Sequence, residues 1–304
     1  MSLLVVGALA YDTVETPAGR VEEVLGGAAT YFAVGASFFG PVRLVGVVGE
    51  DFPKEYLKLF ESRPGLDVSG IQHAPGKTFR WKGKYSEDMN SRETLEVQLN
   101  VFGEFEPVVP QHFQDSDFVF LGNASPVVQR KVLKQIRKPK LTVCDTMDLW
   151  IQTQKHALLD LIRRVDGLLV NDSEAMLLTD CHDVIGAGAA MLELGPSRVI
   201  VKKGEHGAIL FEREHIIPLP AYPVRAVRDP TGAGDSFAGA LMGHLARVTT
   251  GGGSVGTRAF KEALAHGTVA ASFTVEDFGV ARLAEAEEVE ARERFERYRD
   301  ILAL

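Results

Sequence analysis

The stretch RDPTGAGDSFAG, residues 228–239, joins a polar turn to an apolar run that is typical of a buried helix. Gly232, Ala233 and Gly234 leave backbone N–H groups open at the start of that helix, where the helix macrodipole is positive. Asp235 follows them and could be a simple acid in the first helical turn. A plain cap would not need the backbone freedom of two glycines. The stretch therefore predicts an anion site with a carboxylate beside it.

A carboxylate beside an anion site is the combination that phosphoryl transfer requires. The carboxylate accepts a hydroxyl proton, while amides and a metal ion stabilise the charge on the moving phosphoryl group. Residues 229–235, DPTGAGD, resemble the D-T-x-G-A-G-D signature of the ribokinase-like (PfkB) family of carbohydrate and nucleoside kinases, with Pro230 in place of the usual Thr. The resemblance implies a ribokinase-like α/β fold, in which helices flank a mostly parallel central sheet and a small β-sheet forms a lid.

The pattern of apolar runs indicates the same fold class. Short β-branched runs alternate with helical stretches, which favours a mostly parallel sheet covered on both faces. Such sheets bind ligands at the carboxyl ends of their strands. Strands are expected at residues 3–7, 42–48, 118–121, 141–144, 168–170, 199–201 and 208–211, and helices at 28–39, 127–137, 154–164 and 187–194.

Three further motifs follow the order of that family. GALAYD at residues 7–12, with the double glycine at 26–27, is similar to the N-terminal pattern whose Asp and glycines bind substrate hydroxyls. NDSE at residues 171–174 resembles the N-x-x-E motif that helps organise Mg²⁺ and phosphate. KKGEHG at residues 202–207 stands where the family has a nucleotide-binding turn. Four motifs in the right order are far more specific than one.

The resemblance implies a role for each motif. Asp235 is expected to be the catalytic base, and the amides of Gly232, Ala233 and Gly234 the anion hole. The residues expected at ATP and Mg²⁺ are Lys202, Gly204 and Gly207, with Asn171 and Glu174 holding the metal through water. The residues expected at the substrate are Asp12, Gly26, Gly27, Tyr31 and Asn123. From the residues alone, Asp12 could be a turn residue and Glu174 a helix cap.

Residues 78–105 break the α/β rhythm. Leu95, Val97, Leu99 and Val101 alternate with polar residues, a period of two that predicts a half-buried antiparallel strand. We expect one domain, residues 1–304, with a lid formed chiefly by residues 72–105, to which part of 13–25 could add. A small β element of this kind can close over a site, carry a homodimer contact, or be a surface hairpin without a role.

The chain departs from true ribokinases at the substrate positions. Ala10 and Tyr31 replace two Asn residues, and residues 121–126 lack the acid used in ribose recognition. Since an unmatched buried polar group costs about 1–3 kcal/mol, free ribose is a poor candidate. Aromatic and basic side chains take these places and could stack on a base or a sugar ring, or only pack the lid. They are Tyr31, Phe32, Phe79, Arg80, Trp81 and Tyr85.

Composition and charge exclude several classes of binding partner. The 304 residues carry a net charge of −8, which argues against a nucleic-acid binder. No run approaches the roughly 20 apolar residues of a membrane span, and the two cysteines cannot build a zinc cage. Residues 280–304 read as a solvated amphipathic helix. Three short motifs lack the context they need, namely GKT at 76–78, CHD at 181–183 and GGGSVG at 251–256.

These patterns together predict a cytoplasmic enzyme that transfers the γ-phosphoryl group of ATP, with Mg²⁺, to an alcohol of a small sugar or sugar-like substrate. A nucleoside or inositol kinase of the same family is the alternative, and a vitamin-alcohol kinase or a non-catalytic ligand sensor with this fold is a more distant one. Many family members use a monovalent cation, so K⁺ is expected near Asp229 and residues 270–279. A homodimer through the lid is also expected.

Overall fold

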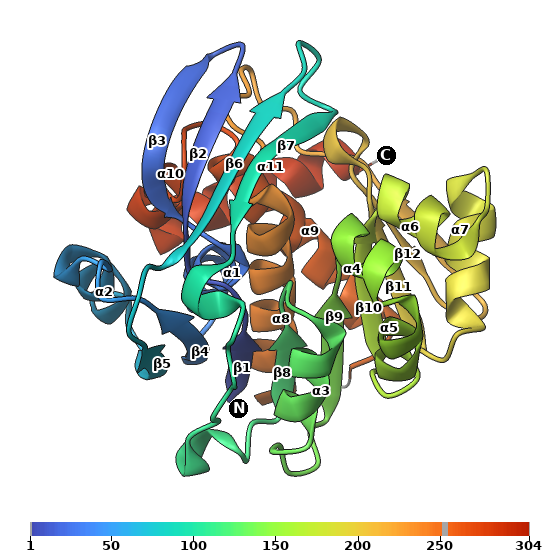
Figure 1. Ribbon diagram of the computed structural model, residues 1–304. Coiled ribbons are helices and arrows are strands. Elements are labelled where there is room, and N and C mark those ends of the chain that lie inside the picture. Colours follow the sequence, from blue (N-terminus) through green and yellow to red (C-terminus); the bar gives the residue numbers. More distant parts are fainter. Residues whose placement is uncertain (1, 251–254, 304) are drawn as a thin grey trace.

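The computed structural model describes residues 2–250 and 255–303, and its centre is a large sheet with helices on both faces (Figure 1). In these residues the sheet has nine strands in the order β13-β12-β11-β10-β9-β8-β1-β4-β5. They are β1 Leu3–Val6, β4 Val42–Val48, β5 Leu66–His73, β8 Phe118–Leu121, β9 Leu141–Asp145, β10 Gly167–Asn171, β11 Arg198–Lys202, β12 Ala208–Phe211 and β13 Ile216–Leu219. All strands from β11 to β5 run parallel, while β12 and β13 are antiparallel to their neighbours. The predicted fold class is confirmed.

Alternate residues of each parallel strand enter two separate cores, which is why these strands read as continuous apolar runs. Leu3 and Val5 pack with one set of helices, and Leu4 and Val6 with the other. The first set is α1 Ala28–Ser37, α2 Lys54–Glu61, α8 Ala233–Thr250, α9 Thr257–Thr274, α10 Ala281–Glu285 and α11 Glu288–Leu302. The second is α3 Pro126–Leu133, α4 Asp148–Thr153, α5 Lys155–Ile162, α6 Asp172–Thr179 and α7 Val184–Leu192.

A second sheet, with the strand order β3-β2-β6-β7, stands at the carboxyl ends of the parallel strands (Figure 1). Its strands are β2 Ala10–Thr16, β3 Gly19–Gly26, β6 Phe79–Tyr85 and β7 Arg92–Gln98. Strand β2 begins four residues after β1 ends, so the small sheet grows directly out of the large one. Strands β2 and β6 are parallel, and the other two pairs are antiparallel.

The structure differs in detail from the expected 72–105 lid. Residues 72 and 73 belong to β5 of the large sheet, and β2 and β3 supply two of the four strands of the small one. The alternating strand ends at Gln98, because Leu99 and Val101 turn into the core of the large sheet. Leu95 and Val97 are 44% and 42% exposed, so the expected half-burial of this strand is wrong.

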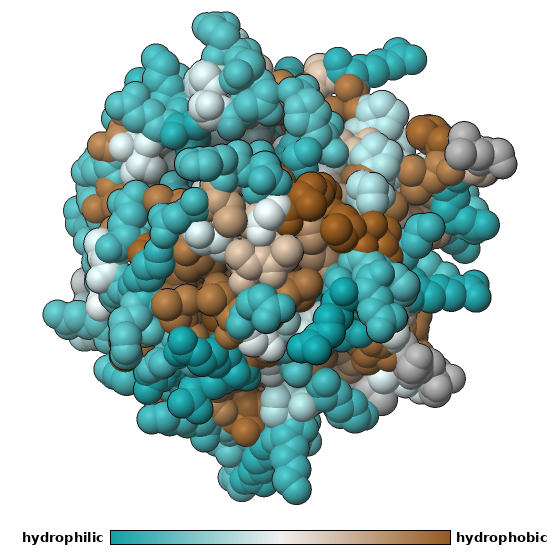
Figure 2. All heavy atoms as spheres, turned by 90° about the vertical axis from the view of Figure 1, so that its right-hand side faces the viewer, coloured by the Kyte–Doolittle hydropathy of each residue, from teal (hydrophilic) through white to brown (hydrophobic). Residues whose placement is uncertain are grey.

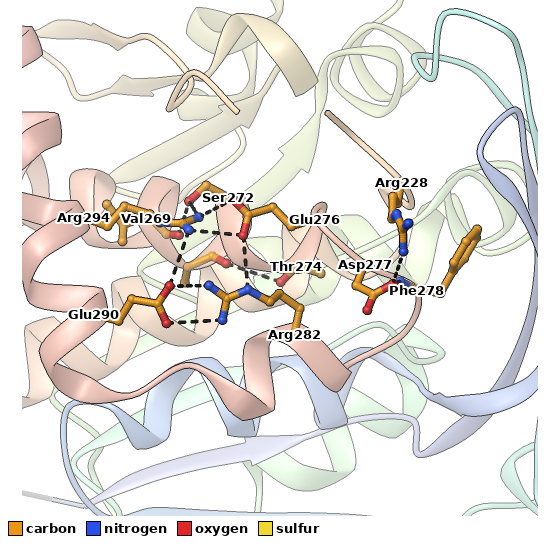
Figure 3. Close-up of polar contacts among 11 residues, drawn as sticks. Arg228, Val269, Ser272, Thr274, Glu276, Asp277, Phe278, Arg282, Glu290 and Arg294 are labelled. Carbon is orange, nitrogen blue, oxygen red and sulfur yellow. Dashed lines mark hydrogen bonds and ion pairs between the residues drawn. The ribbon is translucent and has the colours of Figure 1, made fainter. Parts of the chain in front are cut away.

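The C-terminal helices hold the segment that follows α9. Residues 280–304 form α10 and α11 rather than one helix. Figure 3 shows Arg282 and Arg294 directed at Glu276 and Glu290, with Arg294 2.9 Å from Glu276 and Arg282 3.3 Å from it. Arg228 pairs with Asp277 at 3.3 Å in the same view. The end of α9 is therefore tied both to the C-terminal helices and to the turn at residue 228.

Apolar side chains gather on one side of the surface. Figure 2 looks at the side that carries α6, α7 and the sheet edge, and it shows an apolar area within a hydrophilic rim. Large exposed apolar residues of these elements include Leu177, Ile185 and Ile216. In the described chain no single helix is long and apolar enough to cross a membrane; α6 and α7 reach that composition only together, with a bend of 61°. The GGGSVG motif lies largely outside the described residues.

Candidate active site

Two helix N-termini meet at the site. At the start of α1, Gly27 has φ = 92°, and a Cβ there would lie 2.5 Å from the Ala8 carbonyl oxygen. Helices α1 and α8 approach so closely that a Cβ on Gly239 would lie 2.2 Å from the Phe32 carbonyl oxygen. Small residues therefore bring the Gly26-Gly27 turn and the 232–235 turn to the same place, and both helix dipoles point their positive ends there.

The turn before α8 is shaped by residues on both sides of it. Gly232 has φ = 76°, and a Cβ there would lie 2.4 Å from the Tyr31 ring. The Ala233 N–H donates to the Pro230 carbonyl at 3.2 Å, whereas within the described chain the Gly232 N–H has no acceptor. Asp229 is fully buried and accepts from the N–H groups of Thr231 and Gly279. Of the predicted anion-hole amides, that of Ala233 is thus already engaged in the turn.

Asp235 and Asp12 are two further carboxylates close to this turn. Asp235 is partly buried, and burial raises its pKa, while Lys202 and Arg92 lower it. Asp12 is 4% exposed, and burial together with the Asp229 carboxylate raises its pKa to about 7. A Cβ on Gly26 would collide with the Asp12 carboxylate, so only glycine fits there. Asp12 can therefore take up a proton near neutral pH.

Lys202 ends β11 beside the turn. Its Nζ lies 2.7 Å from the position a Cβ would take on Gly234. Its positive charge lowers the pKa values of Asp145, Glu174 and Asp235, and in the described residues it makes no ion pair. The next turn uses positive φ at Gly204 and Gly207, and a Cβ on Gly207 would lie 2.0 Å from the Leu219 carbonyl oxygen. Gly207 is therefore required by the hairpin itself.

Asn171 and Glu174 form a capping box at the start of α6. The Asn171 side chain accepts from the Glu174 N–H at 2.7 Å, and Glu174 accepts from the Asn171 N–H at 2.7 Å. Burial raises the pKa of Glu174, against a lowering by Lys202. The cap holds a buried carboxylate at the carboxyl end of β10, next to Lys202. A role of either residue at Mg²⁺ stays a prediction.

The substrate residues expected from the sequence have different surroundings. Asn123 follows β8, and its amide oxygen accepts from the Trp150 indole at 2.9 Å while its amide nitrogen contacts the Met147 sulfur. Tyr31 is 1% exposed beneath the Gly232 turn, and its hydroxyl is buried without a partner. Asn123 thus positions Trp150, and Tyr31 supports the turn. Their direct contact with substrate is untested.

Two residues of the site were missed in the sequence. Asp145 ends β9, its Oδ1 is buried without a partner, and burial raises its pKa well above the usual range. An apolar run that ends in an acid at the carboxyl end of a parallel strand is a signal that could have found it. Arg92, the first residue of β7, lowers the pKa values of Asp12 and Asp235. No local pattern marks it, because its position depends on how the small sheet pairs.

One face of the small sheet is turned toward the site. Asp12, Trp81 and Val97 are register neighbours across β2, β6 and β7, so their side chains share a face. On the same face of β6, the Tyr85 hydroxyl accepts from the Thr231 hydroxyl at 3.2 Å. The turn between β6 and β7 reaches farther, where the Asn90 amide donates to Glu205 at 2.9 Å. The small sheet therefore spans the site from the Asp12 side to the Gly204 turn.

The chain matches one known family along nearly its whole length. The profile of the pfkB family carbohydrate kinases covers residues 2–287. The chain belongs to the pfkB family. A cytidine kinase of Thermococcus kodakarensis is 31% identical over 253 residues, which are 81% of this chain and 89% of that protein. An inositol 3-kinase of Arabidopsis thaliana is 26% identical over 300 residues, 91% of this chain and 74% of that protein.

Solved structures agree with this pfkB assignment at the level of the fold. An Escherichia coli protein described as a ribokinase II, in complex with ATP and Mg²⁺, superposes with a TM-score of 0.77 at 21% identity, over 97% of this chain and 99% of that one. The ribokinase-like fold expected from the sequence is confirmed. As a pfkB protein the chain is an ATP-dependent sugar or nucleoside kinase, which excludes the non-catalytic sensor as its main description.

Proposed function

We propose that this pfkB enzyme phosphorylates a hydroxyl of a nucleoside. The observation that carries this choice is the row Asp12, Trp81, Val97 on the face of the small sheet above the site. Asp12 suits sugar hydroxyls, while an indole and an exposed apolar side chain in the same row suit a planar base. The name of the Thermococcus relative supports the same class. A nucleoside contains a sugar, so this proposal keeps the expected sugar hydroxyl as the group that is phosphorylated.

The proposed transfer uses residues on both sides of the alcohol. Asp235 accepts the proton of the attacking hydroxyl, whose oxygen forms the new bond to the γ-phosphorus of ATP as the bond to the ADP oxygen breaks. The backbone N–H groups of Gly232 and Gly234 and the Lys202 ammonium stabilise the charge on the phosphoryl oxygens. Asp12, held against Gly26, orients the sugar. Lys202 and the turn at Gly204 and Gly207 receive the nucleotide.

The donor set fits a hydrated Mg²⁺ ion that is shared with the ATP phosphates. In residues 2–250 and 255–303 no group of three or more His, Cys, Asp or Glu side chains could hold a metal alone. The orphaned Asp145 Oδ1 and the buried Glu174 carboxylate are acceptors suited to metal-bound water. Asn171 and Glu174, with Asp145, would hold the ion through water. Bound Mg²⁺ supplies charge neutralisation between the phosphates.

Phosphoryl transfer from ATP to a panel of alcohols tests the substrate class. The panel contains cytidine, uridine, adenosine, inosine, myo-inositol and free hexoses, and we expect a nucleoside to have the highest kcat/KM. Trp81→Ala should raise the nucleoside KM by about 5- to 100-fold, since base stacking contributes about 1–3 kcal/mol, and Trp81→Phe should restore most of it. Faster turnover of inositol or a hexose than of every nucleoside would refute the nucleoside class and favour the inositol alternative.

Asp235→Asn tests the base independently of the substrate. The variant keeps the shape of the turn but cannot accept the proton, so kcat should fall by at least about 100-fold with any alcohol. Asp183→Asn is the matched control, because Asp183 caps α7 away from the turn and Asn caps helices equally well. If Asp235→Asn keeps wild-type turnover, the assignment of the base is wrong.

The proposal also includes a requirement for K⁺ and a homodimer. A K⁺ requirement near Asp229 is checked by comparing turnover in K⁺ with turnover in a large organic cation. A homodimer through the small sheet would need a polar seam, because the face away from the site carries ion pairs such as Arg80 with Glu23 at 2.7 Å and Lys84 with Glu15 at 2.6 Å. Sedimentation at increasing salt distinguishes such a dimer from a monomer, since salt screens a charged seam.

A further inference from the structure

Arg92 lies at the point where the small sheet, which we call the lid, comes closest to the catalytic turn. It is the register partner of Tyr85, so both side chains leave the same face of the lid. Tyr85 is hydrogen-bonded to Thr231, the residue before Gly232. The guanidinium carbon of Arg92 lies 5.7 Å from the centre of the Trp81 ring. The side chain is thus directed at the turn and supported by an indole on one side.

Four carboxyl groups lie close enough to Arg92 for its charge to affect their pKa values. Asp12, Asp145 and Glu174 are buried, Asp235 is partly buried, and burial raises the pKa of each of these carboxyl groups. The charge of Arg92 lowers the pKa of all four. In the described residues Arg92 nevertheless forms no ion pair with any of them. Arg92 is exposed and its guanidinium is hydrogen-bonded to Tyr85. Because it is bonded to none of the four carboxylates, its remaining N–H groups are free to bind another anion.

We propose that Arg92 binds the phosphoryl group while it is transferred, from the lid side, opposite the amides of Gly232 and Gly234. The inference rests on the proposed anion hole at that turn. The alcohol oxygen attacks the γ-phosphorus, the bond to ADP breaks, and Asp235 takes the hydroxyl proton. Arg92 donates N–H groups to the oxygens of the group in flight. A planar guanidinium suits this task because two of its donors can meet two phosphoryl oxygens at once.

Because Arg92 belongs to the lid, the phosphoryl site is complete only when the lid is closed. The amides of residues 232–234 and Lys202 belong to the large sheet and its helices, whereas Arg92 arrives only with β7. The contacts of Thr231 with Tyr85 and of Glu205 with Asn90 hold β6, β7 and their turn down over the site. With the lid raised, water can reach ATP, but the transferred group then lacks one cationic ligand. The reaction of ATP with water should therefore be slower than its reaction with the alcohol, which takes place under the closed lid.

Arg92→Ala tests the proposal in the whole enzyme. We expect kcat to fall by about 10²- to 10³-fold, the loss typical of one donor to a developing charge, with the alcohol KM changed by less than about threefold. Arg92→Lys should be intermediate, and free guanidinium in the assay should restore part of the Arg92→Ala rate. Lys82→Ala is the control, because Lys82 neighbours Trp81 on the opposite face of β6, and its kcat should stay at the wild-type value.

The outcomes separate this inference from the proposed function. If Asp235→Asn is inactive while Arg92→Ala keeps the wild-type kcat, Arg92 does not bind the phosphoryl group and the anion-hole assignment stands. If neither change lowers kcat, the proposed site itself fails. A fall in kcat that guanidinium does not restore, accompanied by a lower melting temperature, would also overturn the inference, because it would mean that Arg92 only holds the lid together.

Discussion

Asp12 combines a cost to stability with a use in binding. Its carboxyl group is buried against Gly26, and burial with the neighbouring Asp229 raises its pKa to about 7. Because this is above the unfolded value, the folded protein binds the extra proton between about pH 4 and 7, and stability falls as the pH rises through that range. Above pH 7 the full cost of a buried carboxylate is present. A sugar hydroxyl that donates to it would offset part of that cost.

Asp12→Asn should stabilise the ligand-free enzyme and inactivate it. We expect the free energy of unfolding at pH 8 to rise by about 1–3 kcal/mol, because the buried charge is removed. The value of kcat/KM should fall by about 100-fold, since the sugar hydroxyls lose a charged acceptor and one of its two oxygens becomes an N–H donor. Urea unfolding and the kinase assay measure the two effects. Equal stability of mutant and wild type at pH 8 would show that Asp12 is not a buried anion in the free protein.

At this scale the sequence predicts residues within motifs better than residues that meet across the fold. Asp235 and Gly232 stand in one stretch whose chemistry can be inferred locally, and the structure brings them together with Asp12 as expected. Arg92 follows a polar turn and resembles any surface arginine. Only the pairing of Arg92 with Tyr85 gives it a direction, and that pairing includes a bulge between Lys82 and Gly83 that no periodicity signals.

At the scale of elements, the C-terminal helix supports the catalytic turn from a distance. Arg294 of α11 is 13% exposed, bonds Ser272 and Glu276 at the end of α9, and stacks 3.6 Å from the Phe273 ring centre. The segment after α9 in turn accepts the Arg228 N–H at the Val275 carbonyl. Figure 3 shows the two ends of this link, Arg294 with Glu276 and Arg228 with Asp277.

Arg294→Ala should lower the free energy of unfolding by about 2–3 kcal/mol, because it leaves Glu276 with Arg282 as its remaining partner and removes the stacked guanidinium. The melting temperature should drop by roughly 3–5 °C. Arg299→Ala on the same helix is the control, since Arg299 and Glu296 form an exposed pair that contributes at most about 1 kcal/mol. A change no larger than that of the control would show that this network does not hold α11.

The predicted elements agree with the structure where burial decides them and differ where contacts between distant segments decide them. The apolar runs at 3–7 and 42–48 became β1 and β4 because both faces of these strands are covered. The alternation at 93–105 misled, since Leu95 and Val97 stay exposed and Leu99 leaves the strand. Periodicity reports which face is apolar, but not whether protein or a ligand covers that face.

At the scale of the whole molecule, a pair of histidines makes the fold sensitive to acid. His244 of α8 stacks on His266 of α9 at 4.3 Å, and both ring nitrogens of His244 are buried without a partner. Burial and Arg247 lower the pKa of His244 to about 4, against a raising effect of Glu262. Burial, then His244, lowers the pKa of His266 to about 2. The unfolded chain takes up these protons near pH 6.5, so stability is lost as the pH falls below that value.

Replacement of His244 by Leu should flatten this pH dependence. Between pH 6.5 and about 4 one such histidine contributes a slope of about 1.4 kcal/mol per pH unit. Urea unfolding at pH 7.5 and 5.5 should therefore show a smaller loss in His244→Leu than in the wild type, by about 1 kcal/mol. His156→Leu, on the surface of α5, is the control and should keep the wild-type loss. Parallel losses in all three proteins would exclude the buried pair as the cause.

The direct step from β1 into β2 has a mechanical consequence. Four short crossings join the small sheet to the large one, at residues 7–9, 26–27, 74–78 and 99, so the lid cannot swing like a free hairpin. We expect the lid to move as one rigid unit that rotates about the four crossings. Gly26 and Gly27 lie at one of these crossings, and Asp12 lies in β2 just beyond another. A substrate that binds these residues contacts the lid close to its axis of rotation. Arg92 and Asn90 lie at the end of the lid farthest from the crossings, where a small rotation produces a large displacement.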